Sequence, residues 1–211
     1  NLWPLERGMA YNAYVIRGEK TVLLDTVERG FMDEFLGKVD RVLGGRPLDY
    51  LVINHMEPDH AGSIGEVVRR YPEVTLVGNA KTFEMLEGFF GIHEHLLEVK
   101  DGDILDLGTH RLRFVLTPMV HWPESMMSLE ETRGILFSAD AFGSFGALEG
   151  GLFDDEVDLR VWEGEMRRYY ANIVGKYCAM VVRAMQKLVE APVRMIAPTH
   201  GLVFRTHLSW V

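Results

Sequence analysis

The sequence predicts an α/β fold in which short strands alternate with helices. Apolar runs of strand length recur between residues 10 and 139 and return at residues 193–197, and stretches with helical spacing separate the early runs. Polar residues cluster directly after several of these strands. Because ligands bind at the carboxyl ends of strands in open α/β sheets, the residues that follow the strands are the candidates for function.

Each element is supported by its own pattern. A turn at residues 18–20 separates the first two predicted strands and indicates a hairpin. Apolar residues at positions 31, 35, 39 and 42 have helical spacing, and Pro72 closes the next predicted helix. The predicted strands are residues 10–17, 21–26, 50–54, 74–78, 96–99, 104–107, 111–117, 126–130, 135–139 and 193–197, and the predicted helices are residues 31–43, 62–71, 81–90 and 159–190.

Composition and charge exclude several classes of protein. The 211 residues are 47% hydrophobic and 25% charged, which is typical of a globular domain and not of a disordered, collagenous or coiled-coil chain. A net charge of −9 disfavours nucleic acid as a partner. No apolar run approaches the roughly 20 residues that span a bilayer, so we expect no membrane partner. The single cysteine, Cys178, excludes an internal disulfide, a four-thiolate iron site and a zinc ribbon, and it fits a cytoplasmic location.

A dense cluster of metal-binding side chains follows the predicted strand at residues 50–54. His55, Glu57, Asp59 and His60 lie within six residues, and Pro58 among them predicts a loop because proline breaks a helix. On an extended loop, alternate side chains point to the same side. Imidazole and carboxylate groups bind zinc, iron and manganese. A solvated polar loop is the alternative, and the density of ligand types disfavours it.

Three further candidates share one position in the pattern. His121, Asp140 and His200 each come just after a predicted strand. Taken singly, they would be interpreted as a loop histidine, a helix N-cap and a core histidine. Their shared position favours a common site with the first cluster.

These residues and their spacing resemble the metallo-β-lactamase superfamily, and within it the flavodiiron proteins. The segment from His55 to His60 matches the H-x-E-x-D-H form of the motif, with Glu57 in place of the usual second histidine. Residues 121–126 resemble the family segment H-W-P-[DE]-S-M, and residues 140–143 resemble D-A-F-G. Residues 8–14 and 24–27 also match, so that the resemblance covers essentially the whole chain. It implies a metallo-β-lactamase-like αββα sandwich.

The resemblance implies a binuclear metal site. One metal would be held by His55, Glu57 and His121, the other by Asp59, His60 and His200, with Asp140 as the bridge. A glutamate in place of a histidine moves the site away from zinc toward iron or manganese. We therefore expect two Fe ions, with two Zn or two Mn ions as the alternative. The candidates for the pocket around them, for each of which plain core packing is the alternative interpretation, are Tyr14, Met56, Trp122 and Phe142.

The activity that the resemblance implies is reduction of O2 to water or of NO to N2O. One alternative is a sensor that binds O2 or NO without fast turnover, and another is a dizinc hydrolase of thioesters or lactones. The candidate ligands span residues 55 to 200, which indicates one diiron domain over residues 1–211, and we expect no flavodoxin-like domain in this chain. Electrons would then come from an external flavodoxin, flavin domain or rubredoxin, with FMN supplied only by a missing domain or a partner. A homodimer is also expected.

Overall fold

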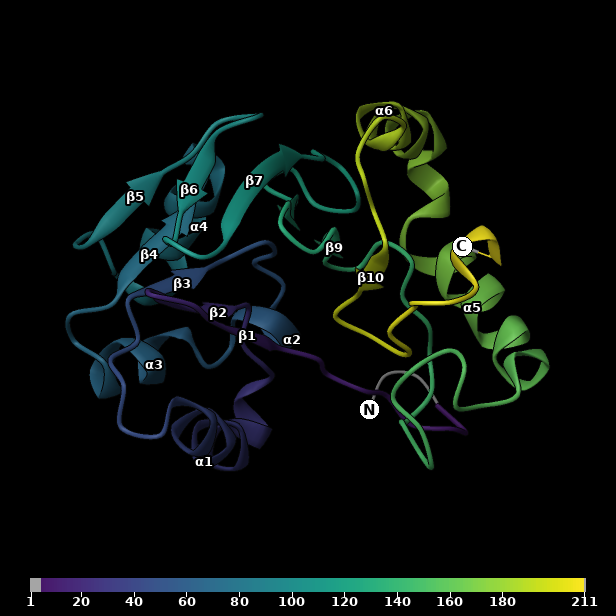
Figure 1. The fold of residues 1–211 in the computed structure, drawn as a ribbon, viewed down its shortest axis with the longest axis horizontal. Coiled ribbons are helices and arrows are strands. Elements are labelled where there is room, and N and C mark those ends of the chain that lie inside the picture. Colours follow the sequence, from purple (N-terminus) through teal and green to yellow (C-terminus); the bar gives the residue numbers. More distant parts are fainter. Residues whose placement is uncertain (1–4, 211) are drawn as a thin grey trace.

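The computed structural model describes residues 5–210 and consists of two five-stranded sheets with helices on their outer sides (Figure 1). The first sheet contains β1 (Tyr14–Arg17), β2 (Thr21–Leu24), β3 (Tyr50–Val52), β4 (Thr75–Gly78) and β5 (Leu96–Glu98), in that order. The second contains β10 (Met195–Ala197), β9 (Ile135–Phe137), β8 (Met126–Glu130), β7 (Arg111–Leu116) and β6 (Ile104–Asp106), in that order. Strands β2 to β5 pair in parallel, whereas β6 to β9 pair antiparallel and β9 pairs with β10 in parallel.

Side chains of the first sheet alternate between two hydrophobic layers. Leu23, Leu51 and Leu76 pack against the helices α1 (Met32–Leu43), α3 (Ile64–Arg70) and α4 (Ala80–Phe90). Their neighbours Val22 and Val52 lie in the layer between the two sheets. Because consecutive strand residues point to opposite faces, one short strand supplies both layers.

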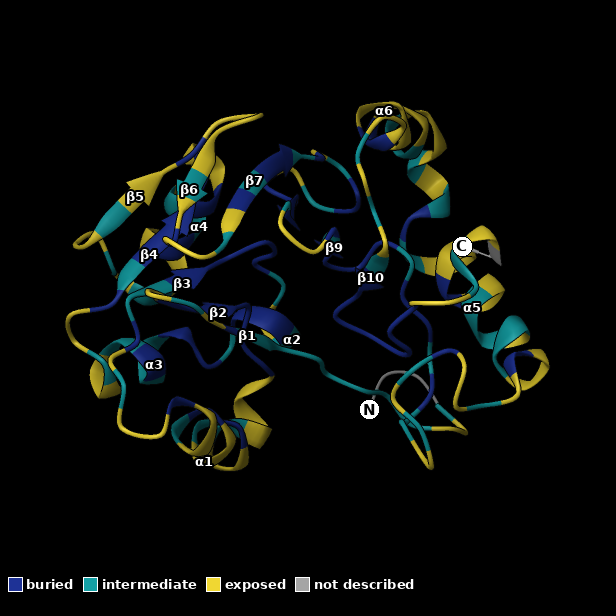
Figure 2. Cartoon of the chain, in the orientation of Figure 1, coloured by how far each residue is buried: buried dark blue, intermediate teal, exposed yellow. Residues whose placement is uncertain are grey.

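The second sheet alternates in the same way. Phe114 and Met126 face the first sheet, and Val115 and Met127 pack with the helices α5 (Leu159–Ile173) and α6 (Cys178–Leu188). The layers are therefore helix, sheet, sheet and helix, which confirms the predicted αββα sandwich. Figure 2 shows the strands mostly buried and the outer helix faces exposed. None of the described helices is long and apolar enough to cross a membrane.

The long helical stretch predicted over residues 159–190 is helical but not continuous. The structure contains α5 and α6 as separate helices joined by a 3-10 turn at Gly175–Tyr177 (Figure 1). At Gly175 a Cβ would lie 3.0 Å from the carbonyl oxygen of Tyr170, so a larger residue at this turn would require the backbone to shift by a few tenths of an ångström. Both helices bury apolar residues at helical spacing, and the period continues across the turn that separates them.

The loop predicted around Pro58 is also partly wrong. Residues Pro58–Ala61 form the short helix α2, with proline at its first position. Proline is tolerated there because the first amide of a helix has no intrahelical acceptor. His55 and Glu57 therefore precede the helix, whereas Asp59 and His60 belong to it.

Candidate metal centre

The seven predicted ligands lie at the edge where the two sheets meet. His55, Asp140 and His200 are each the third residue after a strand, namely β3, β9 and β10. His121 lies in the loop between β7 and β8, Glu57 directly precedes α2, and Asp59 and His60 lie within it. The structure brings all seven together, in two groups.

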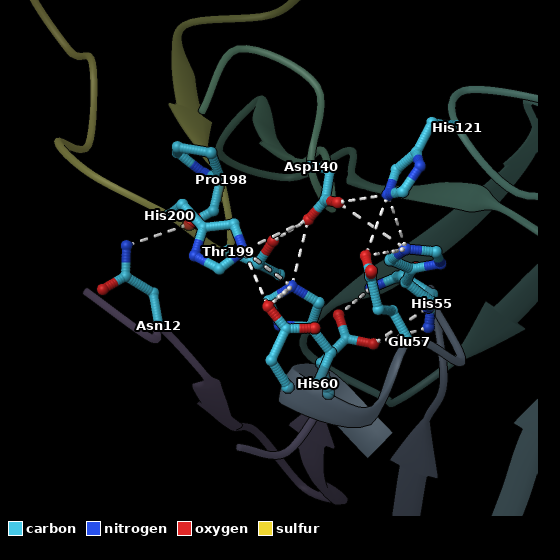
Figure 3. Close-up of polar contacts among 12 residues, drawn as sticks. Asn12, His55, Glu57, His60, His121, Asp140, Pro198, Thr199 and His200 are labelled. Carbon is cyan, nitrogen blue, oxygen red and sulfur yellow. Dashed lines mark hydrogen bonds and ion pairs between the residues drawn. The ribbon is translucent and has the colours of Figure 1, made fainter. Parts of the chain in front are cut away.

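The first group consists of His55, Glu57, His121 and Asp140. The Nε2 atoms of His55 and His121 are 3.3 Å apart. Glu57 Oε2 lies 3.4 Å from the first of these nitrogens and 2.9 Å from the second. Figure 3 shows these side chains pointing toward one another from separate segments of the chain.

The second group consists of Asp59, His60 and His200. The Nε2 atoms of the two histidines are 2.9 Å apart. Asp59 Oδ2 lies 3.5 Å from His60 Nε2 and 3.3 Å from His200 Nε2. Both histidines are buried, and the aspartate is half-buried.

Asp140 lies between the two groups and presents one carboxylate oxygen to each (Figure 3). Its Oδ2 is 2.9 Å from His121 Nε2 and 3.6 Å from His55 Nε2. Its Oδ1 is 3.0 Å from His60 Nε2 and 3.6 Å from His200 Nε2. Such an arrangement allows one carboxylate to bind two ions at once.

The donor set fits two metal ions. Within each group the ligand atoms all lie within 4.8 Å of one another. Nitrogen and oxygen ligands bind first-row metals at about 2.0–2.2 Å, so two ligands of one ion lie about 3.0–3.5 Å apart. The contacts above have this spacing. Three carboxylates offset three of the four positive charges of two divalent ions, which lowers the cost of burying them.

The carboxylates and imidazoles shift one another's pKa. Burial raises the pKa of Asp140, but His60, His121 and His55 hold it well below its ordinary value. Burial lowers the pKa of His121, but hydrogen bonds to Asp140 and Glu57 raise it to about 9. Burial raises the pKa of Glu57, and hydrogen bonds from His121 and His55 lower it to about 2. A divalent cation bound here would replace the imidazole protons, since ligands bind metal in the deprotonated form.

Two buried carboxylates hold the segment that carries His55. Asp25 Oδ1 accepts hydrogen bonds from the backbone amides of Asn54 (2.7 Å) and His55 (3.2 Å). Glu124 Oε1 lies 2.8 Å from His55 Nδ1 and accepts from the amide of Met56 at 2.9 Å. Sequence reasoning did not assign either acid to the site. Glu124 lies inside the matched H-W-P-E-S-M segment, and that motif was the available signal.

The segment that carries His200 is held by the N-terminal strand and the residues before it. Tyr14 Oη donates to the carbonyl oxygen of Pro198 at 2.6 Å. Asn12 Nδ2 donates to the same carbonyl at 3.0 Å (Figure 3) and to that of Gly201 at 2.9 Å. His200 Nδ1 donates to the carbonyl of Ala10 at 2.8 Å. These bonds join the first sheet to the second beside the ligand groups.

The four predicted pocket residues lie in different surroundings. The Trp122 ring stands edge-on to His55, with a centroid distance of 5.4 Å. Phe142 lines a cavity of about 690 Å³ beside the Asp140 loop. Tyr14 packs against Phe137 and lines a second cavity of about 620 Å³. Met56 is fully buried in the core under the first helices and lines neither of these two cavities.

Tyr169 is a residue near the centre that the sequence did not indicate. It comes from α5, is buried, and its ring lies 5.5 Å from that of His200. Burial and the neighbouring carboxylates of Asp140, Asp59 and Glu57 raise its pKa well above the ordinary value for a tyrosine. Its position follows only from the packing of α5 on the second sheet, which no local motif predicts.

Similar proteins include nitric oxide reductases. The chain is 42% identical over 207 residues to an anaerobic nitric oxide reductase flavorubredoxin of Klebsiella pneumoniae, and the match covers 94% of this chain and 42% of the relative. A flavorubredoxin homolog of Escherichia coli O157:H7 is 41% identical, with 94% of this chain and 49% of the relative covered. The chain thus spans about half the length of these relatives or less.

Solved structures agree with this likeness. The flavodiiron protein of Giardia intestinalis has a TM-score of 0.92 at 29% identity, over 96% of this chain and 50% of that protein. Rubredoxin oxygen:oxidoreductase of Desulfovibrio gigas has a TM-score of 0.91 at 34% identity, over 95% of this chain and 51% of that protein. Residues 9–201 match the ODP family beta lactamase. The chain therefore belongs to the ODP family of β-lactamase-like proteins and has the metallo-β-lactamase-like fold of flavodiiron cores.

Proposed function

We propose that this chain is the diiron domain of an oxidoreductase that binds O2 or NO and reduces O2 to water or NO to N2O. The observation that carries the proposal is Asp140, whose two oxygens face two separate groups of imidazole and carboxylate ligands. Reduction of one O2 to two waters takes four electrons and four protons. Reduction of two NO to N2O and one water takes two of each.

The proposed ligands divide as the two groups do. His55, Glu57 and His121 would hold one iron, Asp59, His60 and His200 the other, and Asp140 would bridge them. When bound, two irons supply electrons and a template for a diatomic substrate. Glu57 supports iron or manganese over zinc because a carboxylate is a harder ligand than an imidazole.

The surrounding side chains hold the ligands and limit the access of water. Thr199 Oγ1 donates to Asp140 Oδ1 at 2.8 Å and fixes the orientation of the bridging carboxylate. Trp122 covers His55 with the edge-on contact described above. Tyr169 lies beside His200 with its hydroxyl kept in the neutral form, which is a proton donor.

Electrons must come from a second centre. The one cysteine of the chain cannot form a multi-thiolate redox site. The relatives described above are named for flavin and rubredoxin, which supports an FMN-bearing flavin domain, a flavodoxin or a rubredoxin as the donor. We further propose that residues 1–211 act as one diiron domain, that the protein forms homodimers, and that it works in the cytoplasm.

Metal analysis after anaerobic preparation tests the proposal. We expect two irons per chain and consumption of O2 or NO when a reduced flavodoxin or rubredoxin is supplied. Two zinc ions together with thioesterase or lactonase turnover would overturn it in favour of a hydrolase. Two irons with very slow re-reduction and a long-lived gas complex would indicate a sensor.

A further inference from the structure

The buried carboxylate of Glu124 contacts His55 on the side of the imidazole ring that faces away from the other candidate ligands. Its Oε1 lies 2.8 Å from His55 Nδ1 and accepts from the backbone amide of Met56 at 2.9 Å. Its side chain is completely covered, and the other oxygen, Oε2, has no hydrogen-bond partner among residues 5–210. A buried anion with half of its acceptors unused is costly, which indicates that it serves a purpose other than stability.

The histidines of the second group have no comparable partner. His200 Nδ1 donates to a neutral backbone carbonyl, that of Ala10. His60 Nδ1 is buried and has no hydrogen-bond partner in the described part of the chain. The two groups therefore have similar ligands but different hydrogen-bond partners at the remote ring nitrogens: a carboxylate at His55 and a neutral carbonyl at His200.

We propose that Glu124 is a positioning residue that fixes the tautomer of His55 and makes the metal position of His55, Glu57 and His121 the more electron-rich of the two. This inference rests on the proposed function. With its proton held on Nδ1 by Glu124, His55 presents the lone pair of Nε2 to the ligand group. An anionic partner at the remote nitrogen strengthens imidazole as a ligand, and loss of such a partner weakens metal affinity about 10–100-fold.

Two substitutions separate the charge of Glu124 from its hydrogen bonds. In Glu124→Gln, the amide oxygen still accepts from His55 Nδ1–H and the Met56 amide, so the tautomer is kept and only the negative charge is lost. In Glu124→Ala, both are lost. Glu130→Gln is the matched control, because Glu130 is also a buried carboxylate beside a histidine (His110 Nδ1, 3.1 Å) but lies outside both ligand groups.

The measurement is anaerobic binding of ferrous iron in competition with a colorimetric chelator, combined with Mössbauer spectra of the loaded protein. We expect Glu124→Gln to bind two irons, one with unchanged affinity and one about 10-fold more weakly, and to alter the spectrum of one iron only. Glu124→Ala should weaken that same iron by about 100-fold. Glu130→Gln should leave both affinities and both spectra as in the wild type.

The outcomes distinguish the inference from the proposed function. If the wild-type protein binds no pair of irons, the proposed function fails. If it binds two irons but Glu124→Gln matches the control, or if both irons change equally, the inference fails while the function stands. Because Glu124→Gln keeps the shape and the hydrogen bonds of the residue, the test does not depend on whether Glu124→Ala folds.

Discussion

Replacing Asp140 with alanine should remove both metal ions together. The carboxylate contacts four imidazoles, two through each oxygen, at 2.9–3.6 Å. Loss of a residue that only supports a ligand costs about 10–100-fold in metal affinity, so loss of a shared ligand should cost at least about 100-fold in each group. By contrast, Glu57→Gln should weaken one ion, because Glu57 belongs to the first group alone.

The assay is the same anaerobic iron titration, read as ions bound per chain at a fixed chelator concentration. Wild type should hold two ions, Glu57→Gln one, and Asp140→Ala none. Asp140→Asn keeps the shape of the side chain and is the variant to measure if Asp140→Ala does not fold. Retention of one ion at wild-type affinity in both Asp140 variants would refute the bridging geometry, since it would mean that the carboxylate serves only one group.

Three further predictions concern stability. Asp154→Asn should lower the free energy of unfolding by about 2–3 kcal/mol at pH 7, because its buried carboxylate accepts from the amides of residues 205–207. Burial raises the pKa of Asp154 but those amides lower it more, so the stabilisation by its carboxylate is present above about pH 4 and is lost as the pH falls through the folded pKa. The free energies of unfolding of the wild type and the variant, from urea titrations across that range, should therefore converge in acid. A constant difference would contradict the assignment. Gly62→Ala should destabilise the protein and weaken the ion of the second group, because its Cβ would lie 2.5 Å from the carbonyl oxygen of Pro58 in the helix that carries two ligands. Gly37→Ala, where nothing lies within 4 Å, should instead raise stability by up to about 1 kcal/mol through helix propensity, and equal effects at the two glycines in thermal melts would count against the packing argument.

The ligands could be predicted from the sequence because they obey a local rule. His55, Asp140 and His200 each lie three residues after the end of an apolar strand, and the carboxyl ends of strands meet at one edge in this fold. The division of the ligands into two groups came from the family resemblance and agrees with the distances. The residues that surround the ligands were harder to predict from the sequence. Tyr169 reaches the site only through the packing of a distant helix, and Glu124 contacts His55 across 69 residues of sequence. Such contacts depend on tertiary structure, which has no local period or spacing.

The position of the candidate site at the junction of the two sheets would give a bound metal a structural role as well. Each ligand group takes members from both halves of the chain: the segment after β3 supplies four, and the loops after β7, β9 and β10 supply one each. An ion bound by either group would therefore link the two sheets, as the bonds from residues 10–14 to residues 198–201 already do. Ligand binding at 1,000 times the dissociation constant stabilises a folded protein by about 4 kcal/mol, and an ion bound here would direct that energy to the contact between the sheets. Because neither half alone supplies a complete group, a bound ion would add to the hydrophobic layer and the hydrogen bonds that already hold the two sheets together.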